Sequence, residues 1–259
     1  MTMLIVGATS AIAQAYARRT IQGHRCVLVG RSEERLRTIA ADLRARGAIE
    51  TECVAIPTWT SEAIQQWVQD YPHPIDQALI AQGVLPETAQ KEYEQHEIVW
   101  RVNTIEPSAW LLALFQRMSA QPTPGTIAVI TSVAGDRGRA ANAVYGASKA
   151  ALSTLIEALR QRAAHMGAHH VRILDVRPGP VTTPMTMFMK QTPLFATPDR
   201  VAADMDRAMS AGKTGIIYTP WWWRWIMGII KLLPEFVFHR VRFSATTEIY
   251  TSRKATEDQ

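Results

Sequence analysis

A tyrosine and a lysine four residues apart are the pair in this sequence with the clearest potential for chemistry. Tyr145 and Lys149 lie in the alanine-rich run 140–151, which favours a helix, so both side chains would share one helix face. A phenol has a pKa of about 10 and transfers protons poorly at neutral pH unless its anion is stabilised. An ammonium group one turn away would lower that pKa. The pair also arises by chance on helix surfaces, so it does not predict a catalytic site by itself.

A serine upstream could complete such a site. Ser132 follows the apolar run 126–131, which has the length and composition of a buried strand. A hydroxyl at the carboxyl end of that strand could hold a substrate oxygen against Tyr145.

The order and spacing of several motifs resemble the short-chain dehydrogenase/reductase family. The chain opens with an apolar strand, a small-residue turn and an amphipathic helix, and the Tyr-x-x-x-Lys motif is followed by Arg177-Pro-Gly-Pro-Val-Thr-Thr183. The resemblance runs from residue 3 to about 183 and less specifically to about 220. It implies an α/β fold, a Rossmann-like doubly wound parallel sheet of about seven strands with helices on both faces, and NAD(P)-dependent oxidoreductase activity.

Composition fits one such domain with an extension. The 259 residues are 47% apolar and 20% charged, which excludes broad disorder, and we expect the domain at 1–220 and a tryptophan-rich extension at 221–259. The net charge of +5 suits an anionic cofactor or membrane surface. We predict no metal site and no nucleic-acid partner. Two cysteines form no disulfide framework and the chain enters a strand at once, so we expect a cytoplasmic protein.

The first turn is the expected phosphate-binding site, because a helix N-terminus offers backbone N–H groups to a pyrophosphate. The family pattern has three glycines here, whereas this chain keeps Gly7 and has Ala11 and Ala13 at the other two positions. Ala11 places a methyl group where a phosphate normally approaches. An ordinary strand–turn–helix without a ligand is the alternative. The expected cofactor contacts are Gly7, Thr9, Ser10 and Ile12.

The end of the second strand predicts the choice of cofactor. NAD-binding folds place an acidic residue there for the ribose 2′-hydroxyl, but this chain has Gly30 followed by Arg31. Arginine favours a 2′-phosphate, and Ser32 could cap the next helix and offer its hydroxyl. The sequence therefore predicts NADP(H) in preference to NAD(H), although Arg31 could also be an ordinary surface residue.

The resemblance assigns further roles. Asn103 would interrupt a long helix and hold a water that relays protons to Lys149, although an ordinary helix bend is the alternative. Backbone at the exit of the fourth strand and in the proline–glycine loop would contact the nicotinamide ribose, carboxamide and phosphate. The residues expected there are Gly83, Pro178, Gly179, Val181 and Thr183.

The mechanism that the resemblance implies is carbonyl reduction. Tyr145 would donate a proton, Ser132 would orient the substrate oxygen, and Lys149 would lower the Tyr145 pKa and bind the ribose. Two other functions stay open. An epimerase or dehydratase of the same superfamily shares the motif but normally has a second domain, and a non-catalytic dinucleotide-binding scaffold or sensor at a membrane surface is favoured only by the two lost glycines.

Two apolar segments point to a hydrophobic or lipid-linked substrate. Residues 184–195 are rich in methionine and predict either a substrate-covering lid or core packing. In 221–243, an apolar stripe at helical spacing is too short to span a membrane, so it predicts peripheral membrane contact or packing within the protein or against another subunit. The stripe is Trp222, Trp225, Ile226, Ile229 and Leu233. Apolar helices at 108–118 and 141–166 imply, by the resemblance, a homodimer or homotetramer.

Overall fold

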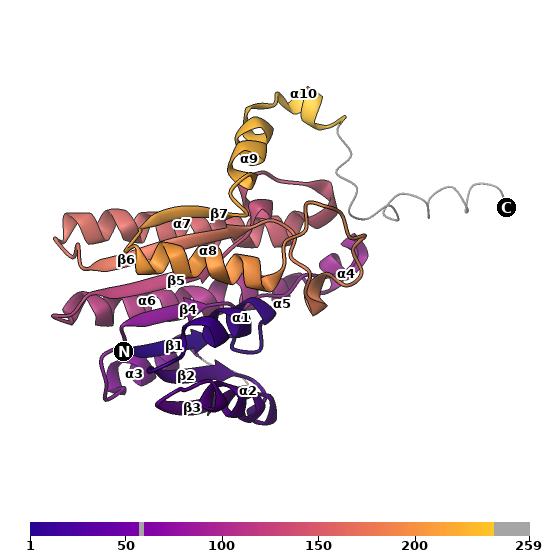
Figure 1. Cartoon of the computed structure of the whole chain (residues 1–259). Coiled ribbons are helices and arrows are strands. Elements are labelled where there is room, and N and C mark those ends of the chain that lie inside the picture. Colours follow the sequence, from indigo (N-terminus) through magenta and orange to yellow (C-terminus); the bar gives the residue numbers. More distant parts are fainter. Residues whose placement is uncertain (57–59, 241–259) are drawn as a thin grey trace.

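The computed structural model describes residues 1–56 and 60–240. Seven parallel strands form one sheet in the order β3-β2-β1-β4-β5-β6-β7 (Figure 1). Short apolar runs, most of them buried on both faces, make these strands, as is usual in parallel sheets. The strands are β1 (Thr2–Val6), β2 (Arg25–Gly30), β3 (Glu50–Ala55), β4 (Gln77–Ile80), β5 (Gly125–Ile130), β6 (Val171–Pro178) and β7 (Gly215–Thr219).

Helices cover both faces of the sheet (Figure 1). Buried side chains of α1, α2 and α8 pack on one face, and those of α3, α6 and α7 pack on the other. The helices are α1 (Ala11–Thr20), α2 (Glu33–Ala45), α3 (Ser61–Asp70), α4 (Ala89–Glu94), α5 (His96–Trp100), α6 (Glu106–Ala120), α7 (Ala143–His165), α8 (Pro198–Ser210), α9 (Trp223–Leu232) and α10 (Glu235–Phe238). The predicted α/β fold with a seven-stranded doubly wound sheet is confirmed.

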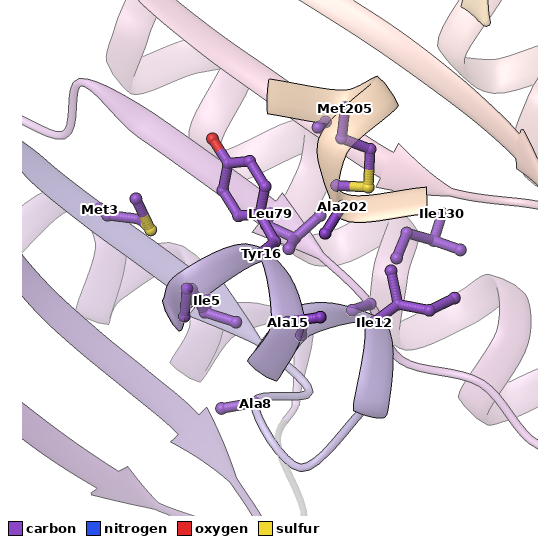
Figure 2. Close-up of a cluster of buried hydrophobic side chains, with 14 of the residues drawn as sticks. Met3, Ile5, Ala8, Ile12, Ala15, Tyr16, Leu79, Ile130, Ala202 and Met205 are labelled. Carbon is purple, nitrogen blue, oxygen red and sulfur yellow. The ribbon is translucent and has the colours of Figure 1, made fainter. Parts of the chain in front are cut away.

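The core beneath α1 fixes the position of the β1–α1 turn. Ile12 and Tyr16 of α1 are buried with Met205 of α8 in one cluster over the sheet (Figure 2). The Tyr16 hydroxyl donates a hydrogen bond of 2.9 Å to Gln77 on β4, so the single polar atom of this ring is satisfied. The amino end of α1 is thereby held above the carboxyl ends of β1 and β4, where the strand order reverses. A ligand crevice is expected at such a reversal.

The tail beyond β7 forms α9 and α10, which project from one end of the domain (Figure 1). α9 buries Trp223, Met227 and Ile230. Two members of the predicted stripe, Trp225 and Ile229, are 67% and 66% exposed. Two other members, Trp222 and Ile226, pack against the buried cluster, so the stripe lies only partly on the domain, because α9 is apolar on two sides and periodicity alone cannot rank them.

The boundary predicted at residue 220 stays a prediction, and positions 241–259 of the extension lie outside the described residues. Within 1–56 and 60–240, no helix has both the length and the apolar character needed to cross a membrane.

Candidate active site

A single cavity of about 760 Å³ lies along the carboxyl ends of the strands. Its walls come from the β1–α1 turn, the ends of β2, β4, β5 and β6, the start of α7, the loop 183–195 and α9. Ser132, Tyr145 and Lys149 all line it, together with most of the residues predicted to hold a dinucleotide. The topology thus brings together groups that lie up to about 180 residues apart in the chain.

The predicted Ser–Tyr–Lys set is brought together by β5 and α7. The Ser132 and Tyr145 side chains are hydrogen-bonded to each other. Ser132 Oγ also accepts a hydrogen bond of 3.1 Å from the backbone N–H of Ala134, which leaves the serine proton free to be donated. Lys149 Nζ lies one turn along α7 from Tyr145 and donates to the carbonyl oxygens of Ile130 at 3.2 Å and Gln82 at 3.4 Å.

The pKa of Tyr145 differs from the sequence-based expectation. Desolvation by burial raises the pKa of the Tyr145 phenol, and the hydrogen bond from Ser132 lowers it by less. The expectation that Lys149 would set a low phenol pKa was therefore wrong for the protein without bound ligand, because two backbone carbonyls engage the ammonium group. At neutral pH Tyr145 is a protonated phenol, the state that a proton donor requires.

Burial acts on Lys149 in the opposite sense. The side chain is 3% exposed, and desolvation lowers its pKa to about 8, although the carboxylate of Asp175 raises it. The lysine is still protonated at pH 7, and its charge is sensitive to any anion that enters the cavity.

Asn103 occupies a short π-helical segment, Arg101–Ile105, that joins α5 to α6. Its amide is fully used within the protein. The carboxamide oxygen accepts from Val84 N at 2.8 Å, and the amide nitrogen donates to Val84 O at 3.0 Å and Ser148 Oγ at 3.2 Å. The side chain therefore ties the exit of β4 to α7 beside Lys149, and it does not line the cavity. The predicted interruption of a long helix is present.

The amino end of α7 is held by a residue that sequence reasoning missed. Glu92 on α4 is buried, and its carboxylate accepts a hydrogen bond of 2.7 Å from the backbone N–H of Tyr145. That N–H belongs to the first turn of α7 and has no partner within the helix. A negative charge at this end also interacts favourably with the helix dipole. Glu92 therefore positions the helical turn that carries Tyr145.

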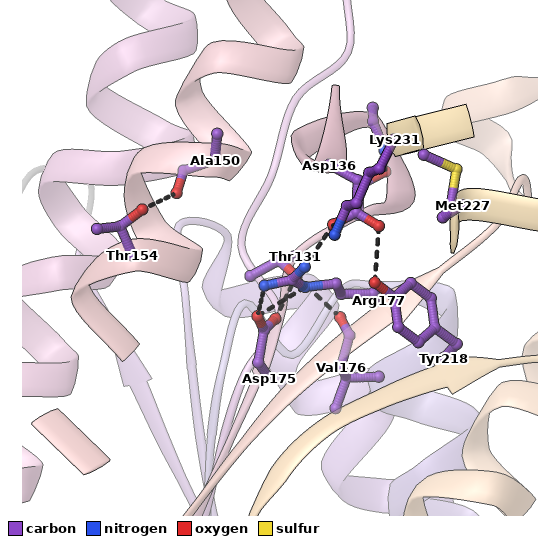
Figure 3. A network of polar contacts seen from close by, with 12 residues as sticks. Thr131, Asp136, Ala150, Thr154, Asp175, Val176, Arg177, Tyr218, Met227 and Lys231 are labelled. Atoms are coloured by element: carbon purple, nitrogen blue, oxygen red, sulfur yellow. Dashed lines mark hydrogen bonds and ion pairs between the residues drawn. The ribbon is translucent and has the colours of Figure 1, made fainter. Parts of the chain in front are cut away.

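A buried ionic network joins β6 to Asp136, which lies in the segment that follows Ser132 in the chain (Figure 3). Arg177 of β6 forms ion pairs with Asp175 at 2.7 Å and with Asp136. Asp136 also accepts a hydrogen bond of 2.8 Å from the Tyr218 hydroxyl and pairs with Lys231 of α9 at 3.3 Å. The two carboxylates raise the pKa of Arg177 despite its burial. The network links the segment after Ser132 to β6, β7 and the tail.

The β1–α1 turn has the shape expected of a phosphate-binding turn. Gly7 has φ of +77°, and a Cβ there would lie 2.8 Å from Gln82 N, so glycine is required. Ser10 precedes the first residue of α1, and its hydroxyl forms no cap hydrogen bond, so the first N–H groups of α1 face the cavity without a side-chain partner. Thr9, Ser10 and Ile12, for which cofactor contacts are predicted, line the cavity, and so does Ala11.

Arg31 lies at the rim of the cavity together with Arg35, which sequence reasoning missed. Neither forms an ion pair with a carboxylate in the described part of the chain. Ser32 caps α2, because its hydroxyl accepts a hydrogen bond of 3.4 Å from the backbone N–H of Arg35. The residue does not line the cavity, so the structure gives no support for the predicted contact between its hydroxyl and a phosphate. Glu106 also lines this wall and is hydrogen-bonded to Gln82 at 3.1 Å.

The exits of β4 and β6 form the remaining wall. Gly83, Pro178, Gly179, Val181 and Thr183, for which cofactor contacts are predicted, all line the cavity. Apolar side chains from the loop 183–195 line it too, namely Met185, Met189, Leu194 and Phe195. Two further lining residues escaped sequence reasoning, Arg139 and Trp223. Neither belongs to a motif, and only the fold places them beside Tyr145 and Gly179.

Comparison with known proteins agrees with this geometry. Residues 1–193 match the family model described as short chain dehydrogenase. An uncharacterized oxidoreductase of Mycobacterium tuberculosis is 35% identical over 245 residues, which cover 92% of this chain and 96% of that protein. The chain therefore belongs to the short-chain dehydrogenase family of oxidoreductases.

Solved structures share the fold. A short-chain dehydrogenase from Sphingobium yanoikuyae in complex with NADPH superimposes with a TM-score of 0.72 at 22% identity, covering 96% of this chain and 99% of that one. The bulky-bulky ketone specific alcohol dehydrogenase from Comamonas testosteroni superimposes with a TM-score of 0.73 at 20% identity, covering 96% and 98%.

Proposed function

We propose that this protein is an NADPH-dependent reductase that converts a carbonyl group of a hydrophobic or lipid-linked substrate to an alcohol. The observation that carries the proposal is the single cavity that joins the Ser132–Tyr145–Lys149 set to a helix N-terminus and to two arginines at its rim. The residues of the site fit a dinucleotide, because Gly7 leaves room for close backbone approach and the first N–H groups of α1 have no side-chain cap.

Each residue of the site has a separate role in the proposed reaction. When bound, NADPH would supply the hydride that adds to the carbonyl carbon. Tyr145 donates its phenolic proton to the carbonyl oxygen, and the Ser132 hydroxyl donates a hydrogen bond to the same oxygen as negative charge develops. Lys149, whose ammonium group contacts backbone carbonyls at the exits of β4 and β5, would bind ribose hydroxyls. A proton would reach Lys149 through water held by the π-helical backbone around Asn103, because the Asn103 side chain is already fully hydrogen-bonded.

The preference for NADPH rests on Arg31 and Arg35. Arg31 directly follows β2 and Arg35 lies in the first turn of α2, and both line the cavity where a 2′-phosphate would lie. Arg31 also interacts electrostatically with the carboxylate of Glu106 on the same wall. Guanidinium groups bind phosphate through charge-assisted hydrogen bonds. NADPH in the relative from Sphingobium is consistent with this choice.

Titration of the purified protein with NADPH and NADH tests this preference. We expect tight NADPH binding, and we expect Arg31→Ala to weaken NADPH by roughly tenfold or more, since a charge-assisted hydrogen bond contributes about 1.5–3 kcal/mol. NADH affinity should stay within twofold. Arg37→Ala is the matched control, because Arg37 lies on α2 outside the cavity. Equal losses for both nucleotides in Arg31→Ala would contradict the assignment.

The cavity wall favours a hydrophobic substrate. Its lining includes Met185, Met189 and Trp223, whose adaptable or aromatic side chains suit an apolar group. Arg139 adds a positive charge to the same wall. The segment 183–195 would act as the cover over this part of the cavity.

The proposal also includes the oligomeric state of the protein and its location in the cell. Apolar residues on α6 such as Leu112 are exposed, and they would pack in a homodimer or homotetramer. Light scattering of the purified protein tests this, and a monomer at micromolar concentration would contradict it. We place the protein in the cytoplasm, where both free cysteines stay reduced, with peripheral membrane contact through the tail.

A further inference from the structure

One carboxylate lines the cavity, and the proposed reaction does not use it. Among the described residues that line the cavity, Glu106 is the single acidic side chain, and it shares that lining with Arg31, Arg35 and Arg101. A basic cavity suits a dinucleotide, because the ligand is a polyanion. A carboxylate in such a cavity repels phosphates, so it is favourable only where the ligand presents a hydrogen-bond donor.

The two oxygens of the Glu106 carboxylate have different surroundings. Oε2 accepts a hydrogen bond of 3.1 Å from the side-chain amide of Gln82. Oε1 lies 3.9 Å from Nε of Arg101, which is longer than a hydrogen bond, and it accepts none within the described chain. The side chain is 21% exposed and Oε1 is not enclosed by protein atoms, so a ligand in the cavity can reach this oxygen.

Glu106 lies in the part of the cavity that the proposed function assigns to the adenosine of the cofactor. The 2′-phosphate is assigned to Arg31, and one ribose carries both this phosphate and the adenine base, so the base would lie near Arg31. The Glu106 carboxylate interacts electrostatically with Arg31. Ile56 and Val102 line the same cavity, and their apolar side chains suit the faces of a flat ring.

We propose that Glu106 is a specificity-determining residue that recognises adenine, with Oε1 accepting a hydrogen bond from the 6-amino group of the base. This inference rests on the proposed function, because it takes the adenosine end of the cofactor to lie at Arg31. Adenine presents a donor at position 6, whereas hypoxanthine has a carbonyl oxygen there, as guanine does. A carbonyl oxygen against a carboxylate oxygen forms no hydrogen bond and is repelled. The site therefore rejects a cofactor whose base is hypoxanthine.

Calorimetry with NADPH and with its analogue in which hypoxanthine replaces adenine tests the proposal. The two ligands share both riboses, the 2′-phosphate and the nicotinamide, so the ratio of their affinities reports on the base alone. We expect the wild type to bind NADPH at least about tenfold more tightly than the analogue, the effect of a hydrogen bond to a charged group.

Glu106→Gln should remove this preference. The new amide oxygen would still accept from Gln82, which turns the new NH₂ group toward the base and offers a donor to the carbonyl oxygen of hypoxanthine. We therefore expect the affinity ratio to fall to about threefold or less. Glu97→Gln is the matched control, because Glu97 is exposed on α5 and does not line the cavity. It should keep the wild-type ratio.

The outcomes separate this inference from the proposed function. Equal affinity of the wild type for the two ligands would overturn the role of Glu106 and leave the reductase proposal standing. An unchanged ratio in Glu106→Gln, with both ligands weakened equally, would overturn it too, because a residue that only binds ribose or holds Gln82 acts on both ligands alike. If the wild type prefers NADH, then NADH and its hypoxanthine analogue replace the two ligands. Failure of the wild type to bind any of these nucleotides would overturn both proposals.

Discussion

At the scale of single residues, burial rather than proximity sets the charge states in the cavity. Tyr145 and Lys149 lie one turn apart, yet desolvation raises the pKa of the phenol and lowers that of the amine. Burial therefore disfavours the charged form of each group. A bound dinucleotide would bring negative charge to Lys149 and stabilise the ammonium form.

This coupling predicts that NADPH affinity depends on pH. The pKa of Lys149 in the folded protein is about 8, so the amine loses its charge as pH rises through that value. NADPH should bind with little change in affinity from pH 6.5 to 7.5 and weaken above pH 8, by at most about tenfold per pH unit for one linked proton. Binding should also take up a proton between about pH 8 and 10, which calorimetry in buffers of different ionisation enthalpy measures.

Lys149→Met is the control for the pH experiment. It should bind NADPH more weakly at pH 7 and show no further loss above pH 8. The lowered pKa of Lys149 also affects the stability of the folded protein. Because the folded pKa lies below the unfolded value, the charged lysine costs stability below pH 8, and the cost disappears as pH rises toward 10.5. A wild-type affinity that stays constant from pH 7 to 9.5 would contradict the role of Lys149.

At the scale of elements, the catalytic helix is positioned from outside itself. α7 carries Tyr145 in its first turn, and Glu92 of α4 accepts the Tyr145 N–H. Glu92→Ala should destabilise the protein by about 1–2 kcal/mol, the range for loss of a helix cap, and lower kcat for carbonyl reduction. The measurements are the urea unfolding midpoint and steady-state kinetics. Glu92→Gln keeps an acceptor and should lose less.

A neighbouring carboxylate supplies the matched control. Glu94 lies on the same short helix but is exposed, and it accepts a hydrogen bond from the side chain of Gln90. Glu94→Ala should therefore leave both stability and activity near the wild-type values. Equal unfolding midpoints for Glu92→Ala and Glu94→Ala would show that Glu92 does not hold the helix.

These elements also show how far sequence could predict the site. The strands and the Ser132–Tyr145–Lys149 set follow from local runs and spacings. The role of Glu92 could not be predicted in this way, because its carboxylate accepts a hydrogen bond from a backbone N–H that lies 53 positions away in the chain. The inward face of α9 was missed because the helix is apolar on two sides, and its packing depends on the loop after Ser132.

At the scale of the whole molecule, the tail presents one apolar face to the domain and a second to solvent. The outer face contains large side chains that are 62–85% exposed, with Arg224 between two of them. Aromatic groups with a nearby cation are typical of helices that lie in a membrane interface. The outer face consists of Trp221, Trp225, Ile229, Leu232 and Phe236.

This surface predicts binding to anionic bilayers. Vesicles of phosphatidylcholine with about a third phosphatidylglycerol should co-sediment with the protein, because burial of apolar side chains and attraction to anionic lipid act together. The double variant Trp225→Ser/Ile229→Ser should lose most of this binding while keeping its NADPH affinity, since neither residue lines the cavity. Equal sedimentation of the variant and the wild type would contradict a membrane role for this face.

The central claim is that Tyr145 transfers the proton in an NADPH-dependent carbonyl reduction. The most direct measurement is the rate of NADPH oxidation with a panel of bulky hydrophobic ketones, compared between the wild type and Tyr145→Phe at equal NADPH saturation. We predict measurable turnover by the wild type and a loss of about 10²–10⁴-fold in Tyr145→Phe, the usual contribution of a general acid, with NADPH affinity little changed. Ketone-dependent NADPH oxidation at the same rate in both proteins would contradict the account.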